Sequence, residues 1–463
     1  MKVLRAITAT CVALIATALP AFETECVPGS LPTALREHRN ISTLVLSGSA
    51  DASDLFFIAD SLPTLTDLDI SGISIAAYHG KRLKGNTVYP EDAIPAGTFG
   101  GTKLQRVILP PGISVGDMAF ASTALRSILV PARTRIGEGA FADCRTLTEA
   151  KIQGDISSAR HAFRNCTALV NTDIGATTTI PDGAFAGCTS LSEINNTESL
   201  RSIGKEAFYG TASLKNFVFA PGLAYIGDRA FASSGLTEIS LPESLANIGN
   251  GAFFDCKNLV KVILPSSALS LSDYLFTNSP IADMPIPENL QSIGRYAMKG
   301  SSLVAVLLPS SFGSIGDGAM EDSKCLRAID VNALASVPAT GADVWAATNV
   351  ADVKLYVGAN KADFESVPQW QDFDITEGTS GVETPANGHH IKARFTDNIL
   401  TLSSDGPDIS EVLIAKASGE PVINTKPNAP VCVADLRNLR KSTTIIISAT
   451  LADGSRSILK FAL

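Results

Sequence analysis

Ile180-Pro-Asp-Gly-Ala184-Phe185-Ala-Gly-Cys188-Thr-Ser-Leu191 is one copy of a pattern that runs through half of the chain. Two close copies are Ile136-Gly-Glu-Gly-Ala140-Phe141-Ala-Asp-Cys144-Arg-Thr-Leu147 and Ile248-Gly-Asn-Gly-Ala252-Phe253-Phe-Asp-Cys256-Lys-Asn-Leu259. The aromatic position recurs eleven times at intervals of 21 to 23 residues, as Phe99, Phe120, Phe141, Phe163, Phe185, Phe208, Phe231, Phe253, Phe276, Met298 and Met320. A period of this length predicts a solenoid in which one short coil stacks on the next.

Each copy continues into a segment whose first, fourth and sixth residues are apolar, such as Leu104, Val107 and Leu109. This pattern indicates a short strand with one buried face. Each strand is expected to pair with its counterpart in the next coil, about 4.8 Å away, so eleven coils predict a parallel sheet about 50 Å long. We expect the phenylalanines to fill the opposite side of the coil interior. The predicted fold is therefore mainly β, with a solenoid of about 11 coils of 21–23 residues.

The repeat consensus I-G/P-x-x-A-F-x-x-C/S-x-x-L-x-x-I-x-L-P resembles the BspA-like subclass of leucine-rich repeats, which occurs in surface proteins of Bacteroidetes. The resemblance covers residues 94–337, about half of the 463 residues. It implies a curved solenoid whose sheet face binds other macromolecules. It implies no catalytic residue and no cofactor.

The first 21 residues predict a secretory signal, because Lys2 and Arg5 precede an apolar run from Ala6 to Leu19 and small residues follow. The run is too short for a permanent membrane helix, so the protein is not expected to span a membrane after cleavage. We expect residues 22–93 to form an amino-terminal cap of degenerate repeats, which closes one end of the apolar core. Within them, Tyr78 to Tyr89 is polar and broken by glycine, and a surface loop is expected there.

Residues 338–375 are expected to close the other end, with Trp370 and Phe373 as a lid over the last coil. Residues 376–390 are rich in Gly, Thr and Pro and predict a linker. Residues 391–463 alternate between β-branched segments and turn signals, which predicts a small antiparallel β-sandwich. This domain loosely resembles the carboxy-terminal sorting domains of exported Bacteroidetes proteins, and an accessory β-domain is the alternative.

Charge and cysteine usage exclude several classes of function. The net charge of -9 and the pI of 5.2 disfavour binding to nucleic acid. Of eight cysteines, Cys144, Cys166, Cys188 and Cys256 occupy the same repeat position. Thiols stacked in such a column point in parallel, so we expect buried free thiols rather than disulfides. No CxxC pair or neighbouring histidine favours a metal site.

The sequence shows no evident catalytic arrangement. The five histidines form no evident Ser-His-Asp arrangement, and Gly112-Ile-Ser114-Val-Gly116 lacks the strand-turn-helix context of a nucleophile elbow. We therefore predict that the protein is not an enzyme. A carbohydrate-active enzyme whose acid and base come from distant coils stays an alternative.

The third and fifth places of each strand should point outward. In the middle coils these places are polar and mainly acidic, and they form the candidate partner-binding face: Glu149, Lys151, Asn171, Asp173, Glu193, Asn195, Asn216, Glu238 and Ser240. The prediction is an adhesin-like protein, exported to the cell surface in association with the outer membrane or secreted, that recognises a host or microbial surface protein or glycan. A structural spacer without a ligand is the main alternative, because any exposed sheet needs polar outward residues.

Overall fold

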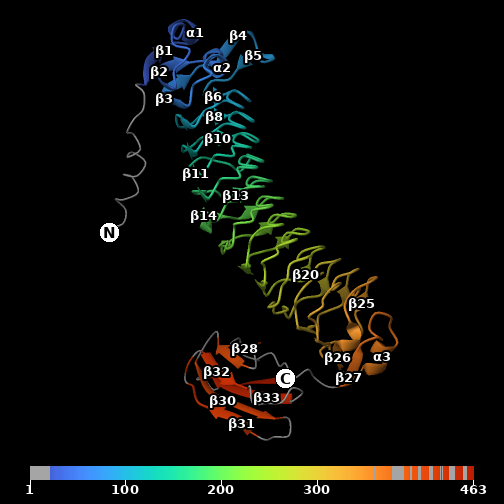
Figure 1. The fold of residues 1–463 in the computed structure, drawn as a ribbon. Helices are drawn as coiled ribbons and strands as arrows, with labels where there is room; N and C mark the ends of the chain where they lie inside the picture. Colours follow the sequence, from blue (N-terminus) through green and yellow to red (C-terminus); the bar gives the residue numbers. More distant parts are fainter. Residues whose placement is uncertain are drawn as a thin grey trace. The chain divides into compact units, whose positions relative to one another are not determined.

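The computed structural model describes residues 21–358, 360–377, 391–396, 399–404, 408–416, 421–427, 429, 431–436, 444–451 and 456–462. The predicted signal, apart from its last residue, and residues 378–390 of the predicted linker lie outside this range. The chain divides into two compact units. The first comprises Met1–Val304, Leu308–Leu326 and Val337–Val350, and the second comprises Ala305–Leu307, Arg327–Ser336 and Ala351–Leu463. Figure 1 shows the coils of the first unit following one another in chain order, from β1 to β25.

The predicted strands form parallel sheets along one side of the first unit, which confirms the fold class. Three sheets follow in sequence: β1 (Phe22–Cys26), β2 (Thr43–Ala50), β3 (Asp67–Ile75) and β7 (Arg106–Ile108); then β9 (Ser127–Val130), β11 (Glu149–Ile152), β12 (Asn171–Asp173) and β14 (Glu193–Asn195); then β17 (Glu238–Ser240) and β19 (Lys261–Ile263). Parallel pairing starts at β1, so the coils extend beyond the eleven that the aromatic repeat predicts.

The parallel pairing is divided among several shorter sheets. Residues 214–219 form no strand, because Phe217 and Phe219 stand where other coils place smaller apolar residues. The Phe217 ring packs between those of Phe208 and Phe231, with centroids 5.4 and 5.0 Å away. At the next interruption Asp283 makes only an isolated bridge to Lys261, and Pro285 has no N–H to donate to a ladder.

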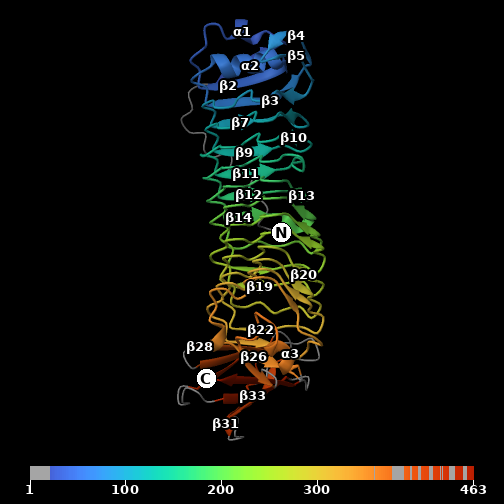
Figure 2. The same cartoon turned by 90° about the vertical axis from the view of Figure 1, so that its right-hand side faces the viewer.

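A second set of strands, each two residues long, lies on another side of the coils (Figure 2). Most of its members contain the apolar residue that opens the repeat, such as Ile180 or Ile226, and in most of these that residue is buried. The sequence did not predict these strands. They are β6 (Ala93–Ile94), β8 (Ser114–Val115) and β10 (Arg135–Ile136); β13 (Thr179–Ile180), β15 (Ser202–Ile203), β16 (Tyr225–Ile226) and β18 (Asn247–Ile248); and β20 (Ser270–Leu271), β21 (Ser292–Ile293), β23 (Ser314–Ile315) and β25 (Ala339–Thr340).

The aromatic column fills the interior as predicted. From Phe99 to Phe276 the nine rings are fully buried and stacked, with centroids 5.1–5.7 Å apart and interplanar angles of 3–19°. Met298 and Met320 continue the column, also buried. Each ring contacts those of the coils before and after it, so the core is a continuous stack and its stability comes from contacts between neighbouring coils.

The glycine after the opening isoleucine lets one coil lie on the backbone of the next. A Cβ added at Gly227 would lie 2.6 Å from the amide nitrogen of Lys205 and 2.7 Å from the carbonyl carbon of Gly204. We expect Gly227→Ala to lower the free energy of unfolding by about 3 kcal/mol, because backbone atoms cannot rotate away from the added methyl group. Gly313→Ala is the matched control, because its Cβ would meet nothing closer than 3.8 Å. Urea unfolding measures both, and equal losses would show that the close approach has no consequence.

The four repeat cysteines are buried free thiols, as predicted. Each also donates a hydrogen bond to the carbonyl oxygen of a column phenylalanine, for example Cys166 to Phe141 at 3.2 Å and Cys188 to Phe163 at 3.1 Å. Burial raises the pKa of the Cys256 thiol to about 11, so it stays protonated at neutral pH. Cys325 is exposed, because Ser323 takes the buried position in that coil.

The amino-terminal segment is more regular than a degenerate cap implies. It contains α1 (Leu31–Ala34), α2 (Ala52–Ser61) and an antiparallel hairpin of β4 (Tyr78–Leu83) and β5 (Asn86–Tyr89), where a surface loop was expected. Tyr89 is buried against Phe56 of α2, and this apolar contact orders the hairpin. Asp51 caps α2, and the buried Asp54 carboxylate accepts hydrogen bonds from the N–H groups of Gly29 and Leu31.

The second unit contains a parallel sheet of β22 (Ala305–Leu307), β24 (Ala328–Asp330), β26 (Lys354–Val357) and β27 (Asp374–Glu377). β27 extends two residues into the segment predicted as a linker. Trp370 is fully buried beside Phe364 of α3 (Lys361–Glu365) and Phe373, with ring centroids 5.5 and 5.7 Å away. Among the described residues, two short 3-10 helices occur, η1 (Thr197–Ser199) and η2 (Val350–Asp352).

The carboxy-terminal strands are antiparallel, as predicted. One sheet has the order β28 (Ile391–Thr396), β29 (Ile399–Ser404) and β32 (Val431–Asp435), and the other the order β31 (Pro421–Thr425), β30 (Ile409–Lys416), β33 (Thr444–Leu451) and β34 (Arg456–Ala462). Leu400 and Leu402 of the first sheet and Val412 and Ile414 of the second are buried, so each sheet has an apolar face.

Candidate binding face

Most of the predicted site residues lie in two rows across neighbouring strands. Glu149, Asn171 and Glu193 are in register on β11, β12 and β14, and Lys151, Asp173 and Asn195 form the adjacent row. Figure 2 shows β11, β12 and β14 one above another. Glu238 and Ser240 lie on β17, two coils further on. We call these eight predicted residues, together with Asn216, the candidate face.

Three carboxylates of the candidate face are available to a partner. Glu149, Glu193 and Glu238 are exposed. None of them accepts a hydrogen bond or forms an ion pair with any residue that the structure describes. A partner that pairs with them would displace only water, without breaking a contact of the fold.

Asp173 and Asn171 contribute differently. Both are half-buried, and the Asp173 carboxylate accepts hydrogen bonds from the N–H of Gly175 at 2.9 Å and from Nδ2 of Asn196 at 2.5 Å. This carboxylate therefore fixes the turn at the end of β12. Its role in the fold was not evident from the sequence, which assigned it to binding.

Asn216 is exposed but not on a strand, because its coil has none. Beside it, Val218 is 70% exposed, the largest exposed fraction among the described large apolar side chains. The candidate face is therefore interrupted between β14 and β17. Glu149, Asp173 and Glu193 lie on adjacent strands, whereas Glu238 lies apart from them on β17.

Sequence reasoning missed a third outward position. The residue directly after the first leucine of each segment is exposed in several coils, as Arg126, Thr148, Val170 and Lys215. The strands begin one residue later, so this residue lies in the bend that enters the strand. Because this residue precedes the strand, the alternation of the strand does not predict whether its side chain is buried or exposed. Only the position of the bend would have shown that it is exposed.

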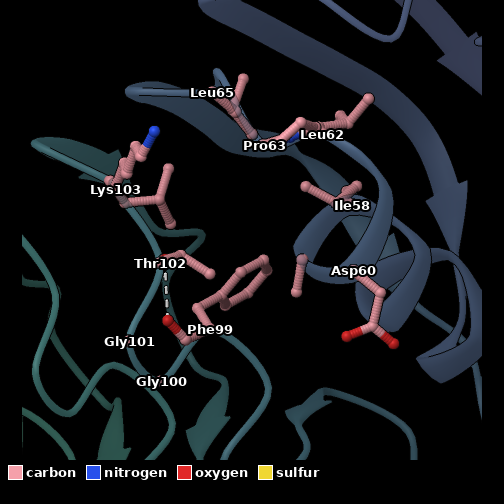
Figure 3. A pocket seen from close by; sticks show the side chains of 12 residues that line it. Ile58, Asp60, Leu62, Pro63, Leu65, Phe99, Gly100, Gly101, Thr102 and Lys103 are labelled. Atoms are coloured by element: carbon pink, nitrogen blue, oxygen red, sulfur yellow. Dashed lines mark hydrogen bonds between the residues drawn. The ribbon is translucent and has the colours of Figure 1, made fainter.

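A hollow of about 390 Å³ lies near the amino-terminal end of the first unit (Figure 3). Ile58, Leu62 and Phe99 line it, with Asp60 and Lys103 at its border. Asp60 forms an ion pair of 2.9 Å with Lys84, and the Thr102 hydroxyl donates to the carbonyl oxygen of Phe99 at 2.7 Å. These polar groups are engaged by neighbours, so the hollow offers no paired acid and base.

The described part of the chain shows neither a metal-ligand cluster nor a membrane-spanning helix. Within it, no three His, Cys, Asp or Glu residues gather in a way that would hold a metal ion. Across the same residues, no helix is both long and apolar enough to cross a membrane.

The stacked coils, whose short strands pair in parallel with those of neighbouring coils, define a leucine-rich-repeat solenoid. Residues 113–237, 158–281 and 224–340 match the family model described as BspA type leucine-rich repeat region, in six copies. The repeat region of this chain belongs to that family, as the sequence pattern predicted. No curated protein matches the chain.

Several solved structures are similar to this chain, and the first named here shows the same fold. A leucine-rich repeat protein from Bacteroides ovatus is 20% identical, with a TM-score of 0.50, and the match covers 72% of this chain and 84% of that one. A leucine-rich cell surface protein from Faecalibacterium prausnitzii is 19% identical, covering 68% and 88%, with a TM-score of 0.36. The T. pallidum leucine-rich repeat protein is 26% identical, covering 45% and 80%, with a TM-score of 0.28.

Proposed function

We propose that the protein is a non-enzymatic binding protein, exported to the cell surface or secreted, that recognises a protein or glycan through the candidate face. One observation carries this proposal. Glu149, Glu193 and Glu238 are exposed carboxylates on two parallel sheets, and no described residue pairs with them.

The form of the candidate face favours a large partner. From β11 to β17 it extends over five coils, about 20 Å at the spacing of paired strands. Solenoids bind macromolecules on such extended surfaces because each coil adds a few outward side chains. The buried aromatic stack and the paired strands hold these side chains in place, so a partner meets a preorganised surface. Membership of the BspA-type family agrees with a binding role.

Export is supported by the first 21 residues, whose positive start, apolar run and small residues form a signal pattern. Within the proposal, the carboxy-terminal antiparallel sheets either direct the protein to the surface or serve as an accessory domain. N-terminal sequencing of the secreted protein tests the first statement, since a mature chain beginning near Phe22 is expected.

The candidate face is tested by replacing Glu149, Glu193 and Glu238 together with Gln. The purified protein is applied to an array of glycans and extracellular-matrix proteins, and Kd is measured for each component that binds. We expect affinity to fall by about tenfold or more, because three desolvated charge contacts are lost.

The control variant replaces Glu37, Glu91 and Glu288 with Gln. These residues are also exposed, and the change in net charge is the same. Equal losses for the two variants, or full binding by the first, would contradict the proposed face. Failure of the unsubstituted protein to bind any component would favour a structural spacer.

A further inference from the structure

One turn of the coil requires an unusual backbone conformation. The residue two places before each column residue has positive φ, between 53° and 64°, in all eleven coils from Gly97 to Gly318. Glycine adopts this conformation without steric penalty and occupies five of these places: Gly97, Gly139, Gly183, Gly251 and Gly318. Glycine at this position is therefore sufficient for the turn to form.

Two consecutive coils place tyrosine at this position instead. Tyr274 has φ 59° and Tyr296 has φ 53°, and Arg229 with φ 54° occupies the position two coils before Tyr274. Bulky residues rarely adopt this conformation, and where they do the strain points to a function for the side chain. The turn does not require the side chains of Tyr274, Tyr296 and Arg229, so their presence at this position has another cause.

These residues form two groups of contacts that approach each other at Gly251, where an added Cβ would lie 3.6 Å from Cγ of Arg229 and 3.8 Å from Cβ of Tyr274. The Tyr274 and Tyr296 rings are stacked, with centroids 5.4 Å apart and an interplanar angle of 19°. The Arg229 guanidinium lies 5.7 Å from the centroid of Phe254, and Lys299 Nζ lies 5.4 Å from that of Tyr296. We call these five residues the turn-edge cluster, which belongs wholly to the first unit and lies on different segments of the coil from the candidate face.

Each ring of this cluster has at least one covered face. Tyr274 and Tyr296 stack on each other, and a Cβ added at Gly318 would lie 2.2 Å from Cε1 of Tyr296, so the second face of Tyr296 lies against the backbone of the next coil. Arg229 covers Phe254. Tyr296 therefore presents its edge, and Tyr274, which is 38% exposed, has one face stacked on Tyr296. Sugars stack on open aromatic faces, so this arrangement suits a protein better than a glycan.

The cations of the cluster differ in their partners. Lys299 forms an ion pair of 2.9 Å with Glu321. Arg229 is exposed and forms no ion pair with any described residue. The nearest acids along the chain are engaged: Asp228 accepts from the N–H of Asn250, and Asp273 from that of Arg295, both at 2.8 Å. The Arg229 guanidinium, already oriented by Phe254, is thus available for a carboxylate.

We propose that the turn-edge cluster is a second docking surface, which binds a protein segment carrying an Asp or Glu side chain next to an apolar one. The carboxylate pairs with Arg229, and the apolar side chain packs against the edges of Tyr274 and Tyr296. Tyrosine, phenylalanine and arginine are enriched at protein interfaces, and side chains that are already held lose little entropy on binding. The inference is independent of the candidate face.

The test replaces both Tyr274 and Tyr296 with glycine, the residue that other coils carry at this turn. A display library of random twelve-residue peptides is selected against the purified unsubstituted protein. We expect enriched peptides to contain Asp or Glu beside an apolar residue. Their affinity for the double variant should be lower by a factor of about ten or more. The thermal midpoint should change by no more than about 3 °C, because glycine suits the turn.

A matched control replaces Met118 and His161, which have φ 55° and 57° at the same turn in other coils, with glycine. That variant should keep full peptide affinity, as should the variant with the three Gln substitutions on the candidate face. Arg229→Lys should also lose affinity, because lysine keeps the charge but not the planar fork, and it serves if the double variant does not fold. The proposal is overturned if no peptide is enriched, if enriched peptides bind the double variant equally, or if a glycan array shows sugar binding that depends on the two tyrosines.

Discussion

Phe185→Ala should lower the free energy of unfolding by about 3–5 kcal/mol, the range for truncating a fully buried aromatic side chain. The Phe185 ring is fully buried between those of Phe163 and Phe208, with centroids 5.4 and 5.5 Å away and interplanar angles of 4° and 3°. Its neighbours are themselves held by further rings, so they cannot collapse into the space that the substitution leaves. Most of the cavity should therefore persist.

Denaturant unfolding followed by circular dichroism measures this loss. Phe57→Ala is the control, because Phe57 is only half-buried on α2, with Arg39 over its ring. We expect a loss of about 1 kcal/mol or less for the control, as for most partly exposed positions. A loss at Phe185 no larger than that at Phe57 would show that the stacked column does not carry the core.

The stacking of the coils was predictable because two signals repeat with the same period. The aromatic residue fixes the phase of each coil, and the apolar residues at the first, fourth and sixth places of the next segment fix the buried side of its strand. Val107 and Leu109 face inward and Arg106 outward, as this alternation requires. Eleven repetitions make such a signal far more specific than a single segment would be.

The second set of strands was not predictable by the same means. Each is two residues long, too short to show an alternation, and the glycine or proline that follows most of them disfavours a strand assignment. Pairing with equivalent residues of adjacent coils creates these strands, so they are a consequence of stacking. The interruption at Phe217 was not predictable either. The repeat pattern records only that this residue is apolar, and not that its side chain is larger than those at the same place in other coils.

The candidate site was predicted only in part. Alternation correctly assigned Glu149, Glu193 and Glu238 to the exposed side of their strands. It did not reveal that Asp173 is bonded to its own turn, because that contact depends on the local backbone. The tyrosines of the turn-edge cluster did leave a signal: Tyr274 and Tyr296 stand where five other coils have glycine. Its meaning depends on the positive φ, which the sequence does not show.

Thermal unfolding of two deletion variants tests most directly whether the coils are equivalent units that stack through one aromatic column. Removing Ala186–Phe208 takes out one whole period of 23 residues and brings Phe185 into phase with Phe231. Removing only Ala186–Asn196 shifts every later coil by half a turn. We predict one cooperative transition for the whole-period deletion and none for the half-period deletion, since contacts between neighbouring coils supply the stability. Similar melting of the two variants, or loss of structure in both, would contradict the account.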